Sequence, residues 1–185
     1  MSSSELIRWG GLAAMLAGAT FIVLMLIPEG PPGSFLYTLN SLVFVVAVLL
    51  MLAGLAGFHA LQNEAYGRAG FYTVAVAGVA QIVAQVGLMS GSTALEFLDF
   101  LGLLGVIVGL VLYGAATLQA RVLPRWCGVG FIVGLPVWLA VSVVLGNEFG
   151  GSLGGTIFGL LWLGLGYVLW SGRGTATEEP SPRVR

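Results

Sequence analysis

Six long apolar runs, separated only by short stretches rich in Gly, Pro and polar residues, constrain the fold of this chain more than any other feature. Crossing the roughly 30 Å hydrocarbon core of a bilayer takes about 20 residues of α-helix. Each run is near or above this length, and none alternates every second residue as a barrel strand does. The sequence therefore predicts an all-α, integral membrane bundle of six transmembrane helices. Their predicted ranges are 10–27, 35–61, 69–89, 94–120, 126–145 and 149–170.

The composition indicates lipid rather than water as the solvent of this chain. Of 185 residues, 58% are hydrophobic and 8% are charged, whereas a soluble domain carries roughly a quarter charged residues. The net charge of −1 lacks the basic excess that nucleic-acid binding requires. With Cys127 as the single cysteine and His59 as the single histidine, multi-cysteine and multi-histidine metal sites are excluded. We expect no metal and no cofactor.

The distribution of basic residues predicts the topology. Every arginine falls before the first run, between the second and third, between the fourth and fifth, or after the sixth. The opposite side carries only acidic residues near its loops: Glu29, Glu96, Asp99 and Glu148. Under the positive-inside rule both termini are cytoplasmic, and Arg121–Trp126 is a tight cytoplasmic turn. We expect residues 1–171 to form the membrane domain and residues 172–185 to form a disordered cytoplasmic tail.

A weak internal repeat involves the same turn. Gly57–Arg68 aligns with Gly114–Arg125, and glycine, leucine, glutamine and arginine recur at matching positions. The second and third helices are then a distant copy of the fourth and fifth. Shared topology in a compositionally biased chain is the alternative explanation.

Acidic and amide side chains gather in the predicted outer halves of the helices. Such groups inside a membrane protein usually face its interior or a wet cavity. The pattern predicts an outward-open polar pocket for a cation or a cationic small molecule, with Asp99 as its best candidate. Thr93 and Glu96 also fit a capping box, and the amides can simply bond neighbouring helices. The candidate ligand-binding residues are Asp99, Glu96, Glu148, Gln81, Gln85, Asn40 and Tyr37.

Glycines spaced four residues apart predict close helix packing, because the missing side chains let two helix backbones approach each other. We expect this packing within one chain, with a homo-oligomer formed through the sixth helix as the alternative. The ridge residues are Gly151, Gly155 and Gly159 in the sixth helix, with Gly105 and Gly109 in the fourth. Trp138 and Trp162 lie in the middle of their helices and are expected either to pack the core or to line a ligand cavity.

Two stretches, Gly54–Gly70 and Gly114–Gly134, are similar to those of small multi-span inner-membrane proteins of high-GC bacteria, which form loosely defined families without a defined function. The resemblance implies a location in the bacterial cytoplasmic membrane and supplies no functional residue. The leading hypothesis is a non-enzymatic protein that binds a small or lipid-like ligand, or a membrane partner, through its acidic outer half. The alternatives are a transporter or channel component and a membrane enzyme that uses Asp99 and Glu96 as acid–base groups.

Overall fold

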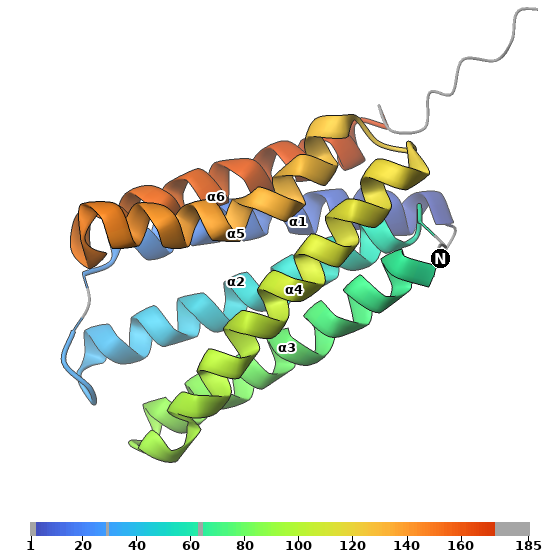
Figure 1. Cartoon of the computed structure of the whole chain (residues 1–185). Coiled ribbons are helices and arrows are strands. Elements are labelled where there is room, and N and C mark those ends of the chain that lie inside the picture. The colour runs from blue at the N-terminus through green and yellow to red at the C-terminus, as the bar shows by residue number, and fades with distance from the viewer. Residues whose placement is uncertain (1–2, 29, 63–64, 173–185) are drawn as a thin grey trace, which may run out of the picture.

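The computed structural model describes residues 3–28, 30–62 and 65–172, and within them the chain is all-helical (Figure 1). The six predicted helices are confirmed, and each is long and apolar enough to cross a membrane. A single turn of 3-10 helix, η1 (Thr93–Leu95), precedes α4. The predicted tail from residue 173 onward lies outside the described residues. The helices are α1 (Ser3–Leu26), α2 (Phe35–His59), α3 (Ala65–Met89), α4 (Glu96–Ala120), α5 (Arg125–Leu145) and α6 (Asn147–Trp170).

The helix ends differ from the predicted ones where polar residues join a helix. Helix α1 begins at Ser3 instead of Gly10, with Glu5 in its first turn, where an acidic side chain suits the helix dipole. Helix α4 begins at Glu96, and its N-cap is Leu95, which makes no side-chain cap bond. The predicted capping box with Thr93 as the N-cap is therefore wrong.

The turn between α4 and α5 is as short as the sequence predicts. Arg121 adopts a left-handed conformation with φ of 53°, and its backbone N–H donates to the carbonyl of Thr117. Pro124 directly precedes the first residue of α5, a place where proline does not cost a helical hydrogen bond. Leu123 is buried and ties the turn to the core.

The six helices form a closed ring in chain order. Each helix packs on the next one along the chain, and α6 returns to pack on α1. The most extensive contacts join α3 to α4 and α1 to α6. Within the described residues, helices two or three positions apart make no extensive backbone contact, so side chains from all six helices fill the interior of the ring.

Glycines allow close approaches between neighbouring helices. A Cβ atom on Gly159 would lie 2.7 Å from the carbonyl oxygen of Gly18, and one on Gly114 would lie 2.6 Å from that of Gly128. A Cβ on Gly57 would lie 2.6 Å from the Cα atom of Gly10. No side chain fits at these distances, so the helices touch backbone to backbone.

The ring is tight at one end and open at the other. The glycine contacts that join α1 to α2 and α4 to α5 lie near the end that holds the α2–α3 and α4–α5 turns. At the opposite end, the set α1, α5 and α6 diverges from the set α2, α3 and α4 (Figure 1). We call the tight end the arginine end, since Arg8, Arg68, Arg121 and Arg125 lie there, and the open one the acidic end.

Candidate functional site

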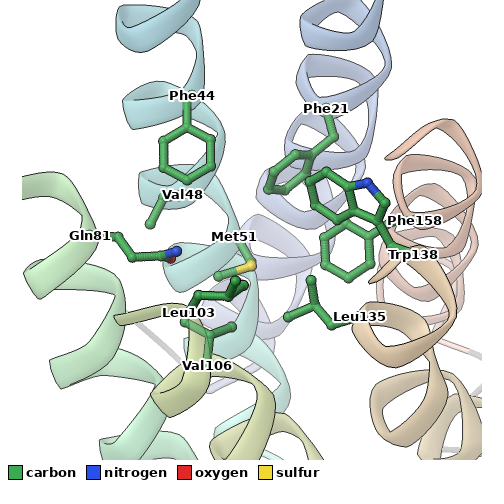
Figure 2. A pocket seen from close by; sticks show the side chains of 10 residues that line it. All are labelled: Phe21, Phe44, Val48, Met51, Gln81, Leu103, Val106, Leu135, Trp138 and Phe158. Atoms are coloured by element: carbon green, nitrogen blue, oxygen red, sulfur yellow. The ribbon is translucent and has the colours of Figure 1, made fainter. Parts of the chain in front are cut away.

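A small cavity lies at the centre of the ring and is lined by residues of all six helices. Its volume is ≈ 70 Å³, and Figure 2 shows its walls. The lining is apolar except for Gln81, whose side chain reaches in from α3 (Figure 2). The other lining residues are Phe21, Phe44, Val48, Met51, Leu103, Val106, Leu135, Trp138 and Phe158.

A larger cleft of ≈ 590 Å³ adjoins this central cavity on the side of the acidic end. Its walls come from the last turn of α1, the outer part of α2, and α5 and α6. Phe44 and Trp138 line both spaces. We call the cleft and the cavity together the funnel, since the cleft lies on the side of the acidic end and the cavity lies at the middle of the bundle. The remaining residues of the cleft are Leu24, Met25, Leu26, Ile27, Pro28, Asn40, Gly151 and Ser152.

Trp138 is held firmly where the cleft meets the cavity. Its indole N–H donates to the carbonyl oxygen of Gly151 at 3.0 Å. Its ring packs on Phe158 with centroids 5.6 Å apart and on the edge of Phe21 at 6.4 Å. Of the two alternatives for the mid-helix tryptophans, Trp138 lines the cavity and Trp162, which is 1% exposed, packs the core.

An aromatic cluster closes the funnel toward the arginine end. Phe131 lies at its centre and meets Phe58, Tyr113 and Trp162 edge to face, with centroids 5.3, 5.3 and 5.9 Å apart. All four side chains are buried. Edge-to-face pairs of this kind each stabilise the fold by about 0.5–1.5 kcal/mol beyond the burial of the rings. The cluster is therefore well packed between the central cavity and the arginine end. We call these four residues the aromatic floor.

The predicted polar residues do not form a single group. Gln81 lies in the central cavity and Asn40 lines the cleft. Gln85 and Asp99 instead pair with each other between α3 and α4, where the Gln85 amide donates to a carboxylate oxygen of Asp99 at 3.5 Å. This hydrogen bond is long and therefore weak, and neither residue lines the cavity or the cleft.

The other candidates lie at the margin of the bundle. Glu96 is exposed at the start of α4. Tyr37 is half-buried in the first turn of α2, and its backbone N–H donates to the Ser34 hydroxyl, which caps the helix. Glu148 belongs to the first turn of α6, but its side chain lies outside the described residues. Among the described residues, none that line the cleft or the cavity carry a charge.

The predicted ridge glycines pack within the chain. Gly155 and Gly159 face Met25 and Gly18 of α1, while Gly105 and Gly109 face Ala77 and Val74 of α3. Because α1 covers the ridge of α6, a second copy cannot use Gly155 and Gly159. Gly151 differs from them, since a Cβ there would meet only the Ser142 hydroxyl, at 4.0 Å. It borders the cleft.

Sequence reasoning missed a buried polar pair near the arginine end. The Gln62 amide donates to the Thr117 hydroxyl at 2.7 Å, and that hydroxyl donates to the Tyr113 carbonyl at 2.9 Å. Gln62 is only 2% exposed, although it lies in the segment that the sequence leaves between the second and third helices. Its counterpart in the proposed repeat, Gln119, is exposed. The repeat stays a prediction, since the two glutamines have different surroundings.

His59 and Cys127 are the remaining titratable groups that the sequence singles out. No group of three or more His, Cys, Asp or Glu side chains suited to a metal occurs within the described residues. His59 stacks on Phe71 with ring centroids 4.4 Å apart, and Cys127 is buried without a disulfide partner. These contacts fit a packing role for both residues.

No protein-family model, no curated protein and no solved structure matches the chain.

Proposed function

We propose that the chain is a multi-pass protein of the bacterial cytoplasmic membrane that binds a small, membrane-soluble molecule in the funnel. The observation that supports this proposal is the ≈ 590 Å³ cleft beside the central cavity, with Phe44 and Trp138 as walls of both spaces. Ligand sites are typically concave, largely apolar and equipped with a few polar groups. Here Asn40, Ser152 and Gln81 are those groups.

The distribution of charge supports an orientation with the funnel opening outward. The arginine end carries the basic residues of the described chain, and basic loops favour the cytoplasmic side. The acidic end then faces the outside, and the cleft is reached from the outer leaflet or the external solution. The lipid bilayer is the surrounding partner in this arrangement.

The alternative functions receive less support. A channel needs an open path, whereas the aromatic floor fills the bundle beneath the cavity. A membrane enzyme that uses Asp99 and Glu96 needs both carboxylates at a common cavity, but Asp99 pairs with Gln85 and Glu96 is exposed. A binding protein requires only the funnel.

A single substitution in the cleft tests this proposal. Gly151→Phe places a ring in open space, because a Cβ at this position meets only one atom, at 4.0 Å. The protein is purified from its membranes, and native mass spectrometry measures any lipid-like molecule that stays bound. We expect an adduct in the wild type and in Leu153→Phe, which changes an exposed residue of the same helix, and its loss in Gly151→Phe. An adduct that survives in Gly151→Phe, or none in the wild type, contradicts the proposal.

A further inference from the structure

The side chain of Gln81 indicates which class of ligand the funnel binds, an inference that rests on the proposed function. Gln81 is 7% exposed, and its amide points into the central cavity toward Val48 and Met51 (Figure 2). Among the described residues it has no hydrogen-bond partner. A primary amide offers two donors and an acceptor, and without a protein partner these groups are left to water or to a guest in the cavity.

The position of Gln81 is fixed by the close packing of α3 on α4. A Cβ on Gly102 would lie 2.5 Å from the Gln81 Cγ and 3.0 Å from the Ala77 carbonyl oxygen. The stem of the glutamine therefore lies against bare backbone of α4 and cannot turn toward that helix. Its amide is directed to the centre of the ring instead. The neighbouring Gln85, one turn further along α3, has a protein partner in Asp99.

The other residues of the cavity wall indicate the chemistry of the rest of the ligand. The other lining residues are aliphatic, aromatic or thioether side chains, and none carries a charge. A charged guest would lose its hydration without a counterion, which is strongly unfavourable in an apolar site. A pure hydrocarbon would fill the space but leave the amide unpaired.

We infer that the funnel selects an uncharged amphiphile, such as a long-chain alcohol, whose apolar chain extends into the cleft and whose hydroxyl or carbonyl group bonds to Gln81. Gln81 is thus a specificity-determining residue. The ≈ 70 Å³ of the cavity accommodates only the small terminal group of such a ligand. The apolar chain extends past Phe44 and Trp138 into the ≈ 590 Å³ cleft.

A matched pair of probes tests this inference on the full-length protein in nanodiscs. The probes are ω-bromododecanol, which carries a hydroxyl, and bromododecane, which lacks it; bromine quenches tryptophan fluorescence on close approach. The signal from the funnel is the part of the quenching that Trp138→Phe removes. We expect the alcohol to bind about tenfold more tightly than the alkane, a ratio that corresponds to about 1.4 kcal/mol and is within the range of one net hydrogen bond.

Two variants separate the role of Gln81 from the funnel itself. Gln81→Leu should bring the affinity ratio of alcohol to alkane close to one, while Gln85→Leu, the same change outside the cavity, should keep it. Gln81→Met, which preserves the length of the side chain, serves if Gln81→Leu does not fold. Equal binding of both probes by the wild type, or a preference that survives in Gln81→Leu, overturns the inference but leaves the proposed function standing. The absence of any quenching that depends on Trp138 overturns both.

Discussion

Replacing Gly57 with alanine tests the contact that closes the arginine end. The new Cβ would lie 2.6 Å from the Cα atom of Gly10, whereas non-bonded carbon atoms approach each other to only about 3.5 Å. The atom in its way belongs to the backbone of α1 and cannot rotate aside. Helices α1 and α2 must therefore separate by about 1 Å at this crossing.

The size of the effect follows from two opposing contributions. Forcing an extra methyl group into a packed contact costs about 1–3 kcal/mol. Alanine is the better helix former, by up to about 1 kcal/mol. We expect Gly57→Ala to lower the free energy of unfolding by about 1–2 kcal/mol, which reduces the ratio of folded to unfolded protein about tenfold.

Titration with sodium dodecyl sulfate in mixed micelles, followed by circular dichroism, measures this loss. The matched control is Gly151→Ala, the same substitution at a position where the nearest atom to the new Cβ is 4.0 Å away. That variant should be at least as stable as the wild type. The packing argument is refuted if Gly57→Ala unfolds at the same detergent fraction as Gly151→Ala.

Two further predictions concern the buried pair and the orientation. Thr117→Val should lower the free energy of unfolding by about 1–3 kcal/mol, because it leaves the buried Gln62 amide without its acceptor. Adding Gln62→Leu should recover part of this loss in the detergent titration; strictly additive losses would contradict the pairing. Glu96→Cys should react with a membrane-impermeant maleimide added outside intact cells, and labelling only from the cytoplasmic side would reverse the proposed orientation.

Helix number and chain order were predictable because each apolar run must hide its backbone polar groups in a helix when lipid replaces water. The segregation of charge followed from the positions of the arginines between the predicted helices. Glycine spacing also predicted close contacts, but not the partner of each ridge. Which helix covers Gly155 and Gly159 depends on the ring closure between α1 and α6, which no local pattern encodes.

The candidate site was less predictable for a related reason. Polar residue type indicated Gln81 and Asn40, yet the same logic grouped them with Gln85 and Asp99, which pair elsewhere. Helical spacing places Gln81 and Gln85 on one face, but the rotation of α3 against α4 decides which amide points to the centre. Phe44, an ordinary apolar residue in the sequence, lines both spaces only because α2 diverges from α1.

The most direct test of the outward-opening funnel compares two cysteines on α2. Asn40→Cys lies on the wall of the cleft, and Leu42→Cys lies on an exposed apolar face that we assign to lipid. Both are made in a Cys127→Ala background, and a water-soluble, membrane-impermeant thiol reagent is added to one side at a time. If the funnel opens outward, Asn40→Cys should be labelled rapidly from the outside, and Leu42→Cys should be labelled little from either side. Equal rates for the two cysteines, or labelling of Asn40→Cys from the cytoplasmic side, would contradict it.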